Sequence, residues 1–411
     1  MKLVFTYVRH GKTLFNEIRR MQGTCDSPLT EEGIRSAEDT ASALCHTHFD
    51  RAYVSFTERA KDTAQIILKE RNMKAVPLKE LKEFSYGSYD GEMIEALQER
   101  LDAQKFNDDW TDAGGEDLNM FAERAEKAFR RMISEANDGD HILVVSHGTY
   151  FMHLMKTLLK YDREEYIDRM ARLGRPLMPN CGIAVFTYED GVFELVQEPV
   201  TADEYRRKYD PKHVNFIYVR HGETMFNVLG RMQGSSGAPL TKKGIEQAEH
   251  AAERLKDRKI DKAYVSTAER AIDTAAIILE GRGIEAVEDK RICEVNYGAF
   301  EAFIQKDNEE EIMRRHETED WKDAGGENMQ EVWRRFTSFF RYAADHAEDG
   351  DTVLLVSHGN LYLNIVEWFG KSRKSLFEEA FKEGRNPMPN CGIFEFSYDS
   401  EEGFKVIHYM N

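Results

Sequence analysis

Short apolar runs of strand length alternate along this chain with longer segments in which apolar residues recur at helical spacing. Residues 3–8 and 141–146 are rich in β-branched and apolar residues, and each run stops at a polar motif that contains histidine. Residues 30–46 have the spacing of an amphipathic helix, with Thr30 as a suitable N-cap. Nearly continuous apolar strands that alternate with helices predict an α/β fold, in which a mostly parallel sheet is sandwiched between helices.

The whole pattern occurs twice. The segment Phe5–Glu38 recurs as Phe216–Glu249, with more than half of the aligned residues identical. A repeat of roughly 200 residues is the size of a domain and much longer than the unit of a solenoid. We therefore predict two tandem α/β domains, 1–208 and 209–411, which meet in the polar segment 197–213.

Composition and charge exclude several classes of protein. The chain has 411 residues, of which 41% are hydrophobic and 32% charged, so each domain has enough apolar residues for a core. The formal net charge of −18 argues against nucleic acid or an anionic membrane as a partner. The five cysteines form no C-x-x-C pair, and no apolar run is long enough to cross a bilayer. We expect a soluble, cytoplasmic protein with reduced thiols.

Arginine and histidine residues stand at the predicted strand ends. In the first copy, Arg9 and His10 end one strand, His147 ends another, and Arg59 follows a third. Because the carboxyl ends of parallel strands meet at one edge of a sheet, we expect these side chains to surround one point. Two guanidinium groups suit a phosphate dianion, which each can bind in bidentate fashion. A neutral histidine aimed at the phosphorus could act as nucleophile, with the second histidine stabilising charge on the transferred group.

A glutamate precedes a Tyr-Gly turn in each copy, Glu83 in the first and Glu294 in the second. A carboxyl group beside a bound phosphate dianion experiences repulsion between like charges, which favours its protonated form. Such a group could protonate the leaving alkoxide and then accept a proton from the attacking water. We predict that these two glutamates are the general acids.

The second copy holds the complete set at a constant offset of 211 residues from the first. A lone histidine at a strand end is more often structural than catalytic, and a recent duplication would copy structural residues equally well. The catalytic interpretation depends on selective retention, because many helical surface positions differ between the copies while the candidate residues do not. These candidates in the second copy are Arg220, His221, Arg270, Glu294 and His358.

The motifs RHGKTLFN and RHGETMFN, each followed by QG and PLT-x-x-G elements, resemble those of the histidine phosphatase superfamily, which has the phosphoglycerate mutase-like fold. The resemblance covers nearly the whole chain, twice. It implies that His10 and His221 are phosphorylated nucleophiles, that Glu83 and Glu294 are proton donors, and that the chemistry needs no metal or other cofactor. The phosphate pockets implied are Arg9, Asn16, Arg59 and His147 in the first domain, and Arg220, Asn227, Arg270 and His358 in the second.

Three functions stay open at this point. The stretch RMQGTCDSPLT and the short segment between the acid and the second histidine favour a phosphatase acting on a small phosphorylated substrate. Asn360 in SHGN is typical of a phosphoglycerate-type mutase instead, and a phospho-ligand-binding protein with an inactive domain is the third alternative. The second domain has Gly237 in place of Asp26 and Ala302 in place of Gly91, so we expect its site to be the weaker one. The sequence predicts neither the oligomeric state nor the particular substrate.

Overall fold

The computed structural model describes residues 1–104 and 108–411. It divides into two compact units, Met1–Tyr209 (unit 1) and Asp210–Asn411 (unit 2). Within the described residues, no helix is both long and apolar enough to cross a membrane.

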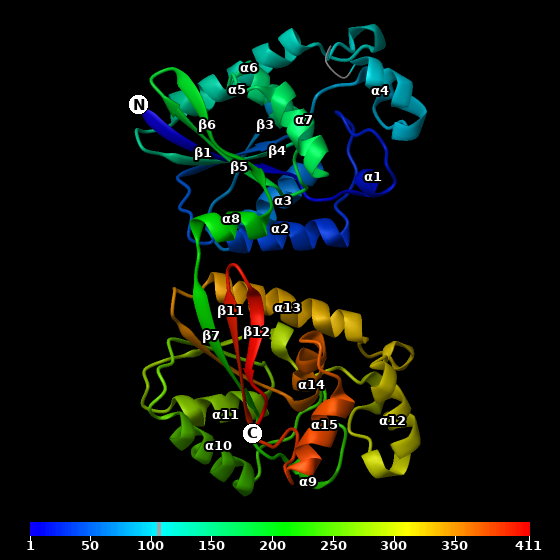
Figure 1. The fold of residues 1–411 in the computed structure, drawn as a ribbon, viewed down its shortest axis with the longest axis vertical. Helices are drawn as coiled ribbons and strands as arrows, with labels where there is room; N and C mark the ends of the chain where they lie inside the picture. The colour runs from blue at the N-terminus through cyan, green and yellow to red at the C-terminus, as the bar shows by residue number, and fades with distance from the viewer. Residues whose placement is uncertain (105–107) are drawn as a thin grey trace. The chain divides into compact units, whose positions relative to one another are not determined.

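Unit 1 is built on one sheet with the strand order β3-β2-β4-β1-β5-β6 (Figure 1). Its described strands are β1 (Lys2–Arg9), β2 (Arg51–Ser55), β3 (Val76–Leu78), β4 (His141–Ser146), β5 (Ile183–Glu189) and β6 (Val192–Val200). Its described helices are α1 (Leu14–Glu17), α2 (Glu31–Ala43), α3 (Glu58–Leu68), α4 (Gln98–Gln104), α5 (Leu118–Glu135), α6 (Gly148–Thr157), α7 (Arg163–Leu173) and α8 (Ala202–Tyr209).

Unit 2 repeats this arrangement with the strand order β12-β11-β7-β10-β8-β9. Its strands are β7 (His213–Arg220), β8 (Lys262–Val265), β9 (Ala286–Glu288), β10 (Thr352–Ser357), β11 (Ile393–Asp399) and β12 (Gly403–His408). Its helices are α9 (Met225–Val228), α10 (Lys242–Leu255), α11 (Glu269–Leu279), α12 (Glu309–Thr318), α13 (Met329–Asp345), α14 (Gly359–Trp368) and α15 (Arg373–Lys382).

Each sheet is mostly parallel and carries helices on both faces, which confirms the predicted fold class. In unit 1, β3, β2, β4 and β1 are parallel, and α2, α3 and α8 cover one face while α5, α6 and α7 cover the other (Figure 1). The remaining two strands, β5 and β6, form an antiparallel hairpin that continues the sheet beside β1. The strand–helix alternation of the sequence did not predict this hairpin.

Alternate residues of the central strand β1 belong to two different cores. Leu3, Phe5 and Tyr7 pack with α5, α6 and α7, whereas Val8 packs with α2 and α3 on the opposite face. This is the period of two that a strand with both faces buried requires. The apolar runs of the sequence are therefore continuous because both faces of each strand are covered.

The register of the central strands places the histidine motifs side by side. Arg9, the last residue of β1, is paired with Ser146, the last residue of β4, and the His10 amide donates to the Ser146 carbonyl over 2.9 Å. His147 follows Ser146 directly, so both histidines leave the same edge of the sheet. In unit 2, Arg220 and Ser357 are paired in the same way.

The loop after β1 is held against the start of α2 by two glycines. A Cβ atom on Gly11 would lie only 2.6 Å from the carbonyl oxygen of Gly33, and one on Gly33 only 2.1 Å from that of Lys12. The predicted N-cap Thr30 is confirmed, since its side chain accepts from the Gly33 amide. The close backbone contact explains why both positions are glycine.

The polar segment at 197–213 includes the helix α8, which completes unit 1. Arg206 of α8 is buried and forms ion pairs of 2.7 Å with Asp39 of α2 and 3.0 Å with Asp203. The segment therefore packs on unit 1, and unit 2 begins directly after Tyr209.

The loop that carries Gly91 in unit 1 has the same backbone shape in unit 2, where Ala302 replaces the glycine. Gly91 has a φ of +93° and Ala302 a φ of +63°, and their carbonyl oxygens accept from Arg20 and Arg231 respectively. A Cβ atom on Gly91 would meet nothing within 4 Å, so only the left-handed backbone opposes a side chain there.

We predict opposite effects of the two reciprocal substitutions on stability. Gly91→Ala should lower the free energy of unfolding of unit 1 by about 1 kcal/mol, because an L residue is strained at positive φ. Ala302→Gly should raise that of unit 2 by about 0.5–1 kcal/mol, with part of the gain offset by the greater entropy of the unfolded glycine. Urea unfolding followed by circular dichroism measures both, and shifts of the same sign for the two variants would contradict the argument.

Candidate active site

His10 is a buried, neutral imidazole with one nitrogen already assigned. Its Nδ1 lies 2.8 Å from the carbonyl oxygen of Gly11, so Nδ1 carries the proton and donates, and Nε2 keeps a lone pair. Burial, followed by the positive charges of Arg59 and Arg9, holds the pKa of His10 well below its ordinary value. A neutral ring with a free lone pair is what a nucleophile requires.

Arg9 and Asn16 each keep N–H groups available beside this histidine. Arg9 donates from Nη1 to the carbonyl oxygen of Met178, and its Nε is buried with no partner among the described residues. The Oδ1 of Asn16 accepts from the Thr13 amide and from Asn180, so the Nδ2 group of Asn16 has no part in these bonds. The buried Nε of Arg9 is costly to the protein without an acceptor, and an anion such as phosphate would satisfy it and also accept from Asn16.

Arg59 is fully buried and almost completely engaged. Its two Nη groups donate to the carbonyl oxygens of Gly23 and Cys25, to Asp26 at 2.9 Å, and to the His147 ring at 3.0 Å. Four of the five guanidinium N–H bonds are thus used, and the Nε is buried without a partner among the described residues. Arg59 can give a ligand only this one N–H, whereas the sequence suggested a bidentate grip.

His147 has both ring nitrogens occupied by protein groups. Because an arginine can only donate, the Nδ1 that faces Arg59 must accept, and the Nε2 then donates to Ser55 Oγ over 2.7 Å. Burial, followed by the nearby cations, holds the pKa of His147 well below its ordinary value. Its ring stands edge-on to that of His10, with 5.2 Å between centroids. These contacts position Arg59 and His10, and they give His147 no free donor.

The side chain of Glu83 lies against the start of α6, and both of its carboxyl oxygens accept hydrogen bonds from backbone amides. They accept from Phe84 at 2.9 Å, Tyr150 at 2.7 Å and Thr149 at 3.1 Å. Burial raises the pKa of Glu83 and outweighs these hydrogen bonds and the charge of Arg59, which act in the opposite direction. The raised pKa favours the protonated carboxyl group, which is the form that a general acid needs.

Unit 2 repeats most of these contacts. His221 Nδ1 lies 2.8 Å from the Gly222 carbonyl, and the His358 ring lies between Arg270 and Ser266. Glu294 accepts from the amides of Asn360 and Leu361, and burial raises its pKa too. A cavity of about 400 Å³ opens onto this set, and its lining includes Arg220, His221, Asn227 and Glu294. Four of the six predicted residues of the second domain thus line one cavity, whereas Arg270 and His358 are not part of its lining.

The replacement of Asp26 by Gly237 removes one hydrogen-bond partner of the buried arginine. Its other hydrogen bonds are the same in both units. Arg270 Nη1 donates only to the Ser236 carbonyl, where Arg59 Nη1 has two acceptors. The loop that holds the arginine is anchored by a carboxylate in both units, since Asp90 accepts from the Thr24 amide in unit 1 and Glu301 accepts from the amides of residues 234, 235 and 236 in unit 2. Asp26 is therefore a support of Arg59, and the predicted weakness of the second site stays a prediction.

Sequence reasoning assigned no contact to the residues that hold the candidate groups in place. Ser55 fixes the tautomer of His147, Thr63 accepts from the Gly11 amide, and Asn180 donates to the His10 carbonyl and to Asn16. Tyr7 donates to the carbonyl oxygen of His147 and accepts from its amide. A signal for all four was present, because each is retained in the second copy, as Ser266, Thr274, Asn390 and Tyr218.

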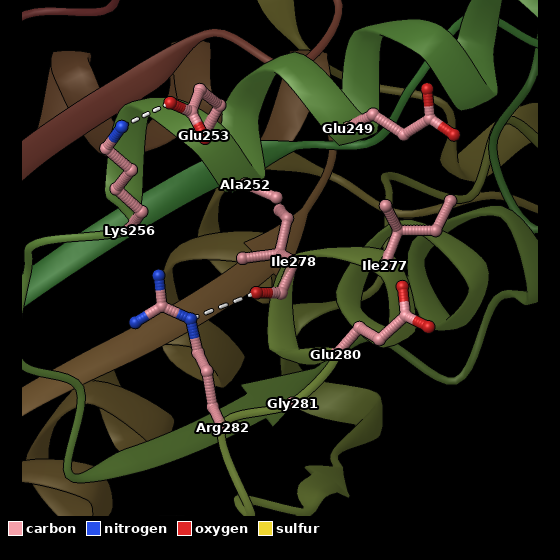
Figure 2. Close-up of a pocket in the computed structure, with 9 residues that line it drawn as sticks. All are labelled: Glu249, Ala252, Glu253, Lys256, Ile277, Ile278, Glu280, Gly281 and Arg282. Atoms are coloured by element: carbon pink, nitrogen blue, oxygen red, sulfur yellow. Dashed lines mark hydrogen bonds and ion pairs between the residues drawn. The ribbon is translucent and has the colours of Figure 1, made fainter.

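A second hollow in unit 2 lies away from this chemistry. It has a volume of about 370 Å³ and lies between α10 and α11, where Glu253 pairs with Lys256 and Arg282 donates to the Ile278 carbonyl (Figure 2). No catalytic candidate lines it.

Both units match one family, described as the histidine phosphatase superfamily (branch 1), over residues 5–199 and 216–410. These two ranges include most of the chain. The chain therefore belongs to the histidine phosphatase superfamily and holds two copies of its domain, as the repeated motifs indicated.

Individual relatives differ in the activity that their names state. The chain is 29% identical over 291 residues to the 2-carboxy-D-arabinitol-1-phosphatase of Triticum aestivum, a match that covers 66% of this chain and 57% of the wheat protein. It is 36% identical over 185 residues to the "Probable phosphoglycerate mutase GpmB" of Cronobacter sakazakii, covering 44% and 83%. Among solved structures, phosphoglycerate mutase from Bacillus anthracis str. Sterne is 26% identical with a TM-score of 0.43, covering 50% and 96%.

The tautomer and charge of the nucleophile can be measured directly. We predict that ¹⁵N NMR of the folded protein shows His10 and His221 protonated on Nδ1 alone and still neutral at pH 6.5, where an ordinary histidine is half protonated, because burial lowers both pKa values. The same residues in the urea-unfolded chain should titrate near pH 6.5. A folded-state midpoint near 6.5 for either ring would contradict the assigned state.

Proposed function

We propose that the protein is a phosphatase that hydrolyses small phosphomonoesters through a phosphohistidine intermediate, with one site in each unit. The observation that carries this proposal is the neutral Nε2 of His10 near two arginines, Arg9 and Arg59, whose charges lower its pKa and whose buried Nε–H groups lack acceptors among the described residues. The same atoms of His221, Arg220 and Arg270 stand in unit 2. Relatives named as phosphatases support the same class of reaction.

In the first step, His10 Nε2 attacks the phosphorus as the bond from phosphorus to the leaving oxygen breaks. The N–H groups of Arg9, Arg59 and Asn16 donate to the phosphoryl oxygens, where negative charge is spread in the transition state. Glu83 gives its proton to the departing alkoxide. The products of this step are a free alcohol, a phosphorylated His10 and an ionised Glu83.

In the second step, water attacks the phosphorus of the phosphohistidine. The Glu83 carboxylate takes a proton from the water, the phosphorus–nitrogen bond breaks, and inorganic phosphate leaves. His10 regains its lone pair and Glu83 its proton, so the site is ready for another cycle. Because the arginines supply the positive charge, the proposal needs no metal ion.

The resemblance of unit 1 or unit 2 to a protein named as a phosphoglycerate mutase favours a second candidate. A mutase would use the same phosphohistidine and then return the phosphoryl group to a different hydroxyl of the bound product. Release of inorganic phosphate in proportion to alcohol formed supports the phosphatase. Transfer of labelled phosphoryl groups between phosphoglycerates without phosphate release would support the mutase.

We predict that the two nucleophiles act independently. His10→Ala and His221→Ala should each remove part of the p-nitrophenyl phosphatase activity, and the double variant should lose at least about 10³-fold, since the covalent route is then closed in both units. By the sequence argument, His10→Ala should cost more. The assay contains a metal chelator throughout.

Three outcomes of this experiment would contradict the proposal in different ways. A double variant with wild-type activity would eliminate both histidines as nucleophiles. Complete loss on His221→Ala with no effect of His10→Ala would make unit 1 the inactive one. Activity that appears only after addition of a divalent metal would overturn the metal-independent mechanism.

The role of Glu83 can be separated from general damage by the choice of leaving group. In a His221→Ala background, Glu83→Gln should slow hydrolysis of an alkyl phosphate by about 10²-fold or more, a typical loss for a general acid. It should affect p-nitrophenyl phosphate much less, because p-nitrophenolate leaves without a proton. Equal losses on the two substrates would mean that Glu83 does not protonate the leaving group.

A further inference from the structure

We propose that the site of unit 2 prefers phosphomonoesters whose organic part carries a second anionic group, and that Arg373 and Lys374 at the start of α15 give it this preference. The first site does not share it. The proposal rests on the proposed function of the histidine site, and it adds the class of substrate.

The cavity of unit 2 is larger than a phosphate group needs. Its volume of about 400 Å³ is in the range of sites for small organic ligands. Besides the catalytic residues, its lining includes three cationic side chains, those of Arg231, Arg373 and Lys374. Glu294 is the only carboxylate residue of this lining. The leaving group of a substrate therefore enters a space whose remaining charges are positive.

Three hydrogen bonds hold the guanidinium group of Arg373, and one of its donors has no partner among the described residues. Its Nη1 pairs with Glu319 and donates to Asn360, and its Nε donates to Glu367 over 2.9 Å. Its Nη2 is buried and has no hydrogen-bond partner among the described residues. Two carboxylates and an amide thus orient a guanidinium group that lines the cavity with one NH₂ unused.

Lys374 and Arg231 supply charge that no carboxylate neutralises. Within the described part of the chain, Lys374 forms no ion pair, and the hydrogen bond of Arg231 goes from Nη1 to the Ala302 carbonyl. Glu367 pairs with Arg373. A carboxylate or a second phosphate on the substrate would meet these groups after the reacting phosphate is bound.

The same helix start in unit 1 has the opposite charge. α7 begins with Asp162 as N-cap and carries Glu164 and Glu165 in its first turn, whereas α15 begins with Ser372 and has no acid there. Glu164 takes the place of Lys374 and pairs with Lys156 over 3.5 Å. Asp162, Glu164 and Glu165 of unit 1 thus correspond to two serines and Lys374 in unit 2.

The buried arginine of α7 also differs, since it keeps no free NH₂. Arg163 donates from Nη1 to His153 at 2.8 Å and from Nη2 to Asp108 at 2.6 Å. Its counterpart Arg373 has one Nη group engaged and one unused. The duplicated helix therefore begins with exposed acids in unit 1 and with donors that line the cavity in unit 2.

The test uses two substrates that differ only in one group. In the full-length His10→Ala protein, turnover of 3-phosphoglycerate is compared with that of glycerol 3-phosphate, in which a hydroxymethyl group replaces the carboxylate. We expect kcat/KM to favour 3-phosphoglycerate, and Lys374→Glu to reduce this preference at least about 10-fold through KM, because the interaction is made in the bound ground state as well. Fructose 1,6-bisphosphate against fructose 6-phosphate tests a second phosphate in the same way.

Two controls separate specificity from damage. Lys382→Glu makes the same charge change at the other end of α15 and should leave the preference unaltered. Glu164→Lys in a His221→Ala background should raise the preference of unit 1 for the anionic substrate. A Lys374→Glu protein that keeps the preference of its parent would overturn the proposal while leaving the phosphatase intact.

Binding gives a readout that does not depend on turnover. If the His10→Ala protein hydrolyses neither substrate, the proposed activity of unit 2 fails. Calorimetry of the same two ligands with the His10→Ala/His221→Ala protein then decides the specificity. Tighter binding of 3-phosphoglycerate that Lys374→Glu abolishes supports the proposal, and equal or absent binding of the two ligands overturns it.

Discussion

The parallel pairing of β1 with β4, and of β7 with β10, is the constraint on which the rest of this structure depends. It joins Arg9 to Ser146 and Arg220 to Ser357, so that two histidines distant in sequence leave neighbouring strands at the same edge. A shift of one residue would turn every side chain of the central strand to the other face of the sheet. The buried pattern on both faces of β1 prevents such a shift, and it thereby fixes the distance between the two rings.

The electrostatics of the site follow from burying two arginines in each unit, of which only Arg59 has an ion-pair partner, Asp26, among the described residues. Arg9, Arg59 and their counterparts are surrounded mainly by carbonyl oxygens and neutral imidazoles, and burial lowers the pKa of the histidines so that these rings add no charge. A buried guanidinium group whose Nε has no acceptor is unfavourable by itself. The fold bears this cost at one place in each unit, and a bound dianion would relieve it. The donors are already oriented, so little reorganisation accompanies the reaction.

Sequence patterns predicted the fold class and every main candidate at the site, since each of these residues adjoins a recognisable strand end and occurs twice. The β5–β6 hairpin was missed, although its turn at Asp190 and Gly191 is a typical signal for two residues at positive φ. The supports of the site could not be assigned in advance. Ser55 meets His147 across 92 residues, and Asn180 meets His10 across 170. Which atoms face each other over such separations depends on packing and rotamers, which no local pattern records.

The position of β1 and β7 at the centre of their sheets also affects how the chain folds during synthesis. Each is the first strand of its unit, yet its partners lie far downstream, and the hydrogen bonds from Tyr7 to His147 and from Tyr218 to His358 both span 140 residues. Contacts of such long range form slowly, because a large loop must close first. The first strand of each unit therefore leaves the ribosome long before its neighbours exist. The second unit can complete its sheet only when the end of the chain, with β11 and β12, has been made.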